Sequence, residues 1–207
     1  MTARDTPLVA AARAAGVSDP RILDAVASVP RAAFVRGEDR DVADTDRALA
    51  TSDGQTTSQP SLIAQMLDEL ALRPEHRVLE LGTGPGYQAA LLARLVAHVV
   101  TIEVVPALAD VARITLAELE VGNVEVVVGD GRVGHAAGAP YDAIVVAAAS
   151  DAVPPAVGEQ LVEGGRLIAP IGDRRGQRLQ VFERVGHGLV EVRRGLEVRF
   201  VPLIGDG

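Results

Sequence analysis

The chain has 207 residues, of which 20 are Lys or Arg and 28 are Asp or Glu, so its formal net charge is −8. With no basic cluster and only 2% aromatic residues, the composition excludes the usual features of a nucleic-acid binder. The absence of cysteine excludes disulfides and thiolate chemistry. The chain shows neither an apolar run of 18 residues nor a secretory signal pattern. We therefore expect a cytoplasmic monomer without nucleic-acid or membrane partners.

The first 75 residues are expected to form a helical region that carries a polar loop. Apolar residues recur at helical spacing after Pro20, and Pro30 ends that helix. Residues 52–58 are polar and typical of a turn. Pro60 then stands in the first turn of another helix, which Arg73-Pro74 is expected to close.

Residues 76–207 alternate between strands and helices and are expected to form the core of one domain that spans residues 1–207. Continuous apolar strands between helices predict a mostly parallel sheet with helices on both faces. Two later apolar runs, joined through residues 186–188, predict antiparallel C-terminal strands. The fold class is therefore doubly wound α/β with an N-terminal helical extension. Strands are expected at Arg77–Leu81, His98–Glu103, Val124–Val128, Ala143–Ala147, Arg166–Ala169, Leu179–Val185, Leu189–Val192 and Val198–Leu203, and helices at Gln88–Val96, Pro106–Leu119 and Pro155–Leu161.

A glycine-rich turn follows the first of these strands. Gly82, Thr83, Gly84 and Gly86 form a G-x-G-x-G pattern two residues after Glu80. Glycines here permit a tight turn and a close approach of ligand atoms to the backbone. Glu80 would repel the pyrophosphate of a dinucleotide but suits the cationic sulfonium and amino groups of S-adenosyl-L-methionine. The alternative is that the glycines only make a tight strand-to-helix turn.

Two further acidic residues stand at the ends of the next two strands. Glu103 ends one strand and can accept both ribose hydroxyls of a nucleoside, while Asp130, followed by Gly131, can bond the exocyclic amine of adenine. The ends of parallel strands are where α/β proteins bind ligands. The pattern therefore predicts an S-adenosyl-L-methionine site, and the glycine spacing disfavours a nicotinamide-dependent oxidoreductase.

Seven stretches of the chain resemble protein-L-isoaspartate O-methyltransferases, which belong to the class I S-adenosylmethionine-dependent methyltransferases. The resemblance implies a Rossmann-like, seven-stranded fold. It also implies methyl transfer to the free carboxylate of L-isoaspartyl residues in damaged proteins or peptides, with repair through a succinimide. The most specific stretch is G-Q-T-T-S-Q-P. The matching stretches are Val29–Val35, Asp46–Leu49, Gly54–Pro60, Val78–Ala93, Gly129–Gly134, Ala139–Ile144 and Val198–Leu203.

By this resemblance, Ser58 is the active-site serine in a loop that closes over cofactor and acceptor. The alternative reading of the residues is that Ser58 caps the helix that begins near Pro60. No catalytic base is required, because a carboxylate with a pKa of about 4 is already ionised at neutral pH. The same substrate loop contains Gly54, Gln55, Thr56 and Thr57.

Departures from the family pattern concern the acceptor side. Thr45, Thr57 and residues 50–53 each differ from the family's usual residues, which bears on the identity of the acceptor. Two alternatives stay open: a methyltransferase for an aspartate in one dedicated peptide, and a non-catalytic binding protein with the same fold. The three strand-end acids argue against the second. The four histidines lie in different segments, so no metal site is predicted.

Overall fold

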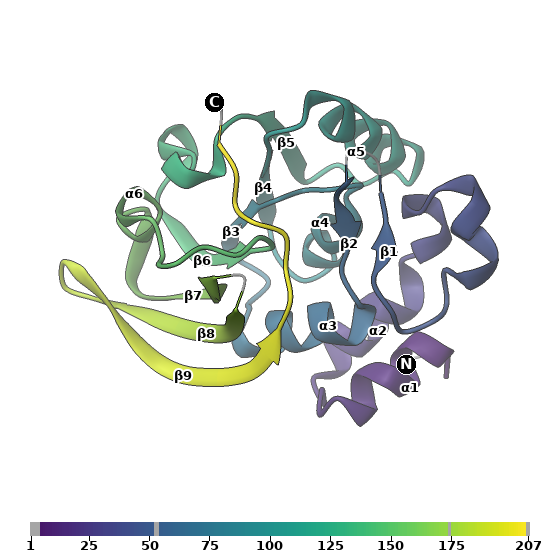
Figure 1. The fold of residues 1–207 in the computed structure, drawn as a ribbon, viewed down its shortest axis with the longest axis horizontal. Coiled ribbons are helices and arrows are strands. Elements are labelled where there is room, and N and C mark those ends of the chain that lie inside the picture. Colours follow the sequence, from purple (N-terminus) through teal and green to yellow (C-terminus); the bar gives the residue numbers. More distant parts are fainter. Residues whose placement is uncertain (1–4, 52–53, 174, 206–207) are drawn as a thin grey trace.

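A computed structural model describes residues 5–51, 54–173 and 175–205, and its main feature is a seven-stranded sheet (Figure 1). The strand order is β5-β4-β3-β6-β7-β8-β9. The pairs from β5 to β7 are parallel, while β8 and β9 run antiparallel to their neighbours. The strands are β3 (Arg77–Leu81), β4 (His98–Glu103), β5 (Val124–Val128), β6 (Tyr141–Val146), β7 (Leu161–Asp173), β8 (Gly176–Val185) and β9 (Gly188–Val198).

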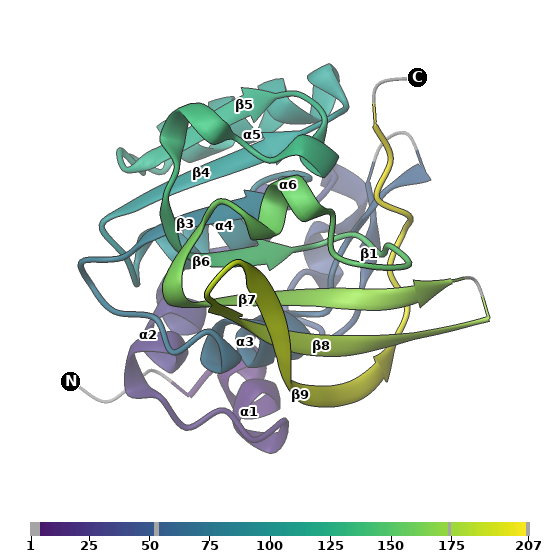
Figure 2. The same ribbon diagram turned by 90° about the vertical axis from the view of Figure 1, so that its left-hand side faces the viewer.

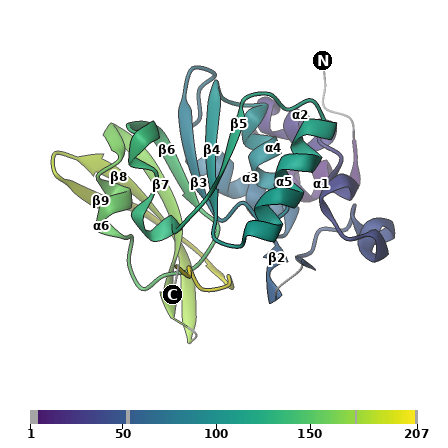
Figure 3. The same ribbon diagram turned by 90° about the horizontal axis from the view of Figure 1, so that it is seen from above.

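Helices cover both faces of this sheet, but unequally. Figure 3 shows α1 to α5 on one side of the strands, whereas α6 lies on the other. A separate pair of two-residue strands, β1 (Leu49–Ala50) and β2 (Thr56–Thr57), stands beside the sheet. The helices are α1 (Pro7–Ala14), α2 (Pro20–Ser28), α3 (Pro60–Glu69), α4 (Tyr87–Ala93), α5 (Pro106–Glu118) and α6 (Pro155–Gly158), with 3-10 turns η1 (Arg31–Phe34), η2 (Gly37–Val42), η4 (Gly131–Val133) and η5 (Ala136–Gly138). The doubly wound, mostly parallel α/β prediction is confirmed.

The N-terminal helices share one core with the sheet. Figure 2 shows α1, α2 and α3 gathered on the same side of the strands. Leu8 of α1 and Ile63 of α3 belong to the same buried cluster as Val78 and Val99 of the two central strands. Burial of such side chains contributes roughly 1.5–3 kcal/mol each. The N-terminal helices therefore pack on the same sheet that carries the strand-end acids.

Several elements match the sequence predictions closely. The strands His98–Glu103 and Val124–Val128 have the predicted bounds, and the helix after Asp19 begins at Pro20 as expected. The Asp19 side chain caps that helix by accepting a hydrogen bond from the Arg21 N–H at 2.8 Å. The predicted hairpin through residues 186–188 forms between β8 and β9.

Several predicted elements have other bounds in the structure, including the helix α4, which ends at Ala93 and not at Val96. The strand expected over Val198–Leu203 is absent, because β9 ends at Val198 and only an isolated bridge joins Pro202 to Ala149. Figure 1 shows the chain beyond β9 running on without forming a strand. We call residues 199–205 the C-terminal strap.

The helix α3 ends at Glu69, before Arg73-Pro74, because Ala71 adopts a left-handed conformation with φ of 49°. The helix predicted over Pro155–Leu161 is the single turn Pro155–Gly158, and Leu161 begins β7 instead. Residues 52 and 53, part of the predicted polar turn, lie outside the described residues. Among the described residues, no helix has the length and apolar character to cross a membrane.

Candidate active site

The glycine turn between β3 and α4 brings the backbone to the carboxyl end of the sheet. Gly82, Gly84 and Gly86 have φ values of 93°, 53° and 101°, which side-chain-bearing residues rarely adopt. A Cβ on Gly86 would lie 3.3 Å from the Cβ of Ala112, so this glycine also permits close packing of α5. A Cβ on Gly84 would meet no atom within 4 Å, so that position faces open space.

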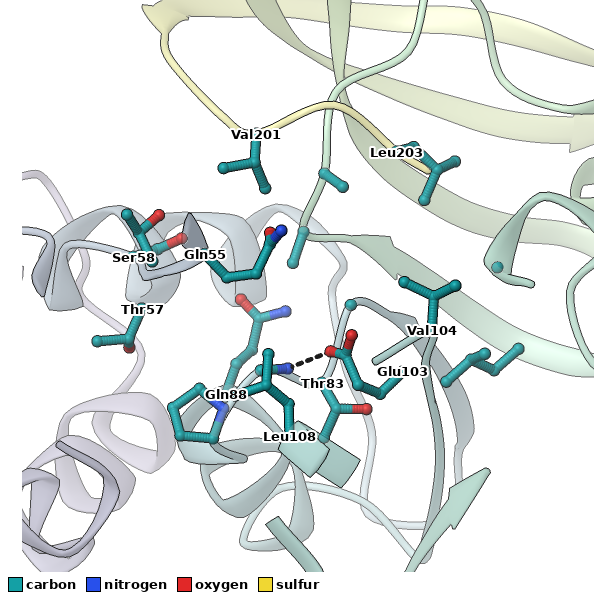
Figure 4. A pocket seen from close by; sticks show the side chains of 18 of the residues that line it. Gln55, Thr57, Ser58, Thr83, Gln88, Glu103, Val104, Leu108, Val201 and Leu203 are labelled. Carbon is teal, nitrogen blue, oxygen red and sulfur yellow. Dashed lines mark hydrogen bonds between the residues drawn. The ribbon is translucent and has the colours of Figure 1, made fainter. Parts of the chain in front are cut away.

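Glu103 stands at the end of β4 and is fixed by two backbone donors. Its Oε2 accepts a hydrogen bond from the Gly84 N–H at 2.8 Å, and its Oε1 accepts one from the Val105 N–H at 3.0 Å. Figure 4 shows the first of these bonds as a dashed line. Each carboxylate oxygen can accept a further bond, so two hydroxyl donors can still be accommodated.

Glu80 lies beneath the cleft and does not line it. Its carboxylate is fully buried and accepts a 2.6 Å bond from the Thr101 hydroxyl, which in turn lies 2.6 Å from the Thr83 hydroxyl. Oε1 of Glu80 has no hydrogen-bond partner within the described part of the chain. Burial raises the pKa of Glu80 to about 8, because removal from water disfavours the charged form. The structure therefore does not place this carboxylate where it was expected to meet a cationic ligand directly.

A cleft opens at the ends of β3 and β4. It is bounded by the substrate loop, the glycine turn, the end of β4 and the C-terminal strap. In Figure 4 the side chain of Gln55 points into the space between Gln88 and Val201, while Glu103 lies on another side. The residues that line it are Gln55, Thr56, Thr57, Ser58, Ile63, Gly82, Thr83, Gly84, Pro85, Tyr87, Gln88, Ile102, Glu103, Val104, Leu108, Gly131, Ala147, Ala148, Val201, Pro202, Leu203 and Ile204.

Ser58 is half-buried and lines this cleft, but it is not the helix cap. The N-cap residue of α3 is Gln59, and it makes no side-chain capping bond. Asp46 instead satisfies the start of the helix, because its Oδ1 accepts from the Ser61 N–H at 2.9 Å. The alternative reading, in which Ser58 caps this helix, was therefore wrong, since a carboxylate from a remote segment takes that role. Ser58 also lines a second groove with Gln59 and β9 residues.

Besides Glu80, three predicted site residues lie outside the cleft lining: Gly54, Gly86 and Asp130. Gly54 is exposed, with a φ of 71° that suits a glycine turn. Asp130 binds Arg132 with both carboxylate oxygens, at 2.7 to 3.0 Å, and this hydrogen bonding lowers its pKa. Its neighbour Gly131 does line the cleft. The expected contact of Asp130 with adenine would thus compete with Arg132.

Sequence reasoning missed three groups of residues at this site. Gln88 lines the cleft from the first turn of α4, and the strap contributes Val201 and Leu203. The strap had been predicted as a strand, so its apolar residues were assigned to a sheet. Arg31 was also missed, although it stands in the stretch Val29–Val35. Its guanidinium donates to backbone carbonyl oxygens, which every residue type carries, so no sequence pattern reveals these contacts.

The cleft fits an adenosine group, with acceptors for the ribose and apolar walls for the base. Glu103 offers spare acceptor positions for two ribose hydroxyls. Val104, Leu108 and Leu203 supply apolar walls for a flat base. The open side of Gly84 leaves space for ligand atoms against the backbone.

Comparisons with known proteins agree with this geometry. A family model described as protein-L-isoaspartate(D-aspartate) O-methyltransferase matches residues 3–207. The protein-L-isoaspartate O-methyltransferase of Methanoculleus marisnigri is 50% identical over 195 residues, covering 94% of this chain and 88% of the relative. That of Roseiflexus castenholzii is 50% identical over 190 residues, covering 92% and 87%.

Solved structures give the same result. A protein-L-isoaspartate O-methyltransferase superposes with a TM-score of 0.88 at 33% identity, over 96% of this chain and 65% of that longer chain. A Plasmodium falciparum structure with S-adenosyl-L-homocysteine bound shares the fold, with a TM-score of 0.84 at 22% identity over 96% of this chain and 97% of that one. The chain belongs to the protein-L-isoaspartate(D-aspartate) O-methyltransferase family.

Proposed function

We propose that this chain transfers a methyl group from S-adenosyl-L-methionine to the free carboxylate of L-isoaspartyl residues in damaged proteins or peptides. The observation that carries the proposal is that Ser58 and Glu103 line the same cleft, one from the substrate loop and the other from the end of β4. A cofactor bound at Glu103 and an acceptor bound at Ser58 would therefore share one enclosed space.

The residues of the cofactor side would act by binding. Glu103 would accept the two ribose hydroxyls, and the backbone at Gly82 and Gly84 would lie against the ligand. When bound, S-adenosyl-L-methionine supplies an electrophilic methyl group on a sulfonium. Thr83 keeps the turn in register, because its hydroxyl bonds that of Thr101 on the neighbouring strand.

The residues of the acceptor side would act by orientation. The Ser58 hydroxyl would donate a hydrogen bond to one oxygen of the isoaspartyl carboxylate, leaving the other oxygen to form the new bond. A carboxylate is ionised at neutral pH, so no residue has to remove a proton. Alignment in a water-poor cleft can then supply most of the acceleration. Val201 and Leu203 of the strap would help to exclude water.

The product ester explains how methylation would lead to repair. The backbone amide nitrogen that follows the esterified residue attacks the ester carbon, loses its proton, and expels methanol, which closes a succinimide. Water then opens the ring on either side and returns part of the material as a normal aspartyl linkage. The chain's own residues are needed only for the methyl-transfer step.

The partner of the proposed reaction is a protein or peptide acceptor. We further propose that the chain works as a monomer, because Ser58 and Glu103 of one chain already line the same cleft, and that it is located in the cytoplasm. Sedimentation equilibrium would test the monomer. A dimer at micromolar concentration would contradict it.

The decisive experiment measures methyl transfer from labelled S-adenosyl-L-methionine to two peptides that differ only in an isoaspartyl or aspartyl linkage. Methylation of the isoaspartyl peptide alone is the expected result. Transfer to neither peptide, with the cofactor bound, would contradict the proposal and favour a dedicated acceptor. Failure to bind the cofactor would indicate a binding protein that retains the fold.

A further inference from the structure

Arg31 is a buried cation whose hydrogen bonds all go to the backbone. Its side chain is 1% exposed. The guanidinium donates to the carbonyl oxygens of Ala43 at 2.9 Å, Thr45 at 3.0 Å and Arg47 at 2.8 Å. A fourth bond, of 3.3 Å, reaches the carbonyl oxygen of Ser58. Within the described residues, no carboxylate oxygen lies within ion-pair distance of it.

This arrangement joins two segments that are otherwise linked through the two-residue β1–β2 pair. Residues 43–47 follow η2, while Ser58 lies in the substrate loop, and both present carbonyl groups to one guanidinium. Buried carbonyls need donors, and a planar guanidinium offers five N–H groups in a fixed geometry. The position of the Ser58 backbone therefore depends on Arg31.

Asp46 holds the same loop from its other end. Its Oδ2 accepts hydrogen bonds from the Gln59 side-chain amide at 2.8 Å and from the Ser61 hydroxyl at 2.8 Å. Its Oδ1 accepts the bond from the Ser61 N–H. Ser58 thus stands between a carbonyl held by Arg31 and a helix start held by Asp46. We call Arg31 and Asp46 the loop clamp.

The loop clamp also contacts the cofactor side of the cleft. The Arg31 guanidinium lies over the ring of Tyr87, 5.9 Å from its centroid. Tyr87 begins α4 directly after the glycine turn, lines the cleft, and packs against Phe34 with a ring-centroid distance of 5.7 Å. One side chain therefore contacts both the loop that carries Ser58 and a wall of the cofactor site.

We propose that Arg31 is a positioning residue, which with Asp46 keeps the substrate loop ordered over the cleft before the acceptor binds. The proposal rests on the proposed function, since it assigns Ser58 to the acceptor. A loop that is already ordered spares the acceptor the entropic cost of ordering it. If only a fraction of molecules has the ordered loop, the apparent dissociation constant of the acceptor rises by the inverse of that fraction.

The test compares Arg31→Lys, Arg31→Gln and Asp46→Asn with wild-type protein. Lysine keeps the charge but cannot span all four carbonyls, so we expect KM for the isoaspartyl peptide to rise about tenfold, as for one or two lost hydrogen bonds. We expect kcat and the dissociation constant of S-adenosyl-L-homocysteine to stay within about threefold, because the Ser58 hydroxyl and Glu103 are intact. Arg31→Gln should raise KM further than Arg31→Lys does, because lysine retains part of the hydrogen bonding of arginine.

Arg166→Lys is the matched control. Arg166 is partly buried and, like Arg31, donates to a backbone carbonyl, that of Glu69 at 3.1 Å, but it lies away from the cleft. This variant should leave KM unchanged. A purely structural role of Arg31 would lower the amount of active enzyme, and hence kcat, without raising KM. That result would overturn the proposal.

Hydrogen exchange keeps the test independent of methyl transfer. Amides of residues 54–59 should exchange about tenfold faster in Arg31→Lys, while those of β4 should not change. Unchanged loop exchange would overturn the proposal even if the peptide assay fails. If Arg31→Gln does not fold, Arg31→Lys and Asp46→Asn decide the question. The wild-type protein could methylate neither peptide while the loop clamp still protects the amides of residues 54–59 from exchange. That result would contradict the proposed function and leave the role of the loop clamp intact.

Discussion

The two sides of the cleft are built in different ways. On the cofactor side, neighbouring strands fix the backbone directly: Gly82 donates to the carbonyl oxygen of Ile102 at 2.8 Å, and Glu103 is held by two N–H groups. On the acceptor side, the contacts of the described residues that hold the substrate loop come from the short β1–β2 pair and from the side chains of Arg31 and Asp46. The cofactor site is therefore a consequence of the sheet, whereas the acceptor site depends on a few individual contacts.

The largest expected effect is a change in the free energy of unfolding when Glu80, the buried acid on the cofactor side, is replaced. The pKa of Glu80 in the folded chain is raised to about 8, above its value in the unfolded chain. Its contribution to the free energy of unfolding is therefore fully present below the unfolded-state pKa and is lost as the pH rises through 8. We therefore expect Glu80→Gln to gain stability over wild type between pH 5 and pH 9, by up to about 4 kcal/mol. Urea unfolding across this range measures the difference.

The exposed Glu75→Gln should show no such pH-dependent gain. If the free energies of unfolding of wild type and Glu80→Gln change with pH in the same way, Glu80 is charged in the folded chain. The cofactor side would then carry the negative charge that the glycine pattern predicted.

The next largest effect concerns Glu103. Its replacement by alanine removes two acceptors and leaves the Gly84 and Val105 N–H groups without their partner. We expect S-adenosyl-L-homocysteine to bind about 100-fold more weakly, as for one or two charge-assisted hydrogen bonds. Isothermal titration measures the change, with the exposed Glu125→Ala on β5 as the control. A loss below about threefold would place the ribose elsewhere.

Ser58→Ala should separate the acceptor side from the cofactor side. We expect kcat to fall about tenfold, because the carboxylate loses one orienting hydrogen bond, while the dissociation constant of S-adenosyl-L-homocysteine stays within about twofold. Exposed Ser28→Ala is the control. Equal losses in turnover and cofactor affinity would show that Ser58 supports the whole cleft and has no specific role toward the acceptor.

The contrast between the two sides also explains how far the sequence could predict them. His98–Glu103 was assigned correctly because a buried parallel strand is a mostly apolar run. Val124–Val128 is an edge strand without fully buried residues, and its four valines indicated a strand by their β-branched side chains. The glycine turn and Glu103 lie at the ends of parallel strands, so their meeting follows from topology. Val198–Leu203 is also rich in apolar residues, yet Val201 and Leu203 line the cleft outside any strand, and apolar composition does not distinguish the two uses.

The acceptor side depends on contacts between residues far apart in the chain. The Ser58 cap was a local inference from a serine before a helix, whereas the actual partner, Asp46, is 15 residues before Ser61. Arg31 is 27 residues from Ser58 and bonds a carbonyl that every residue type carries. Neither contact has a spacing rule that would reveal it in one sequence. The family resemblance placed Ser58 in the loop but could not say what holds the loop.

The smallest expected effect is at Asp130, where sequence and structure differ most on the cofactor side. Its carboxylate is already satisfied by Arg132, so a bond to adenine would replace an existing bond and the net gain would be small. We expect Asp130→Ala to weaken S-adenosyl-L-homocysteine binding about fivefold, well below the loss at Glu103. Titration of both variants under the same conditions makes the comparison. A loss as large as that of Glu103→Ala would mean that the carboxylate leaves Arg132 when the cofactor binds, and that this part of the cofactor side, unlike the substrate loop, is completed only by its ligand.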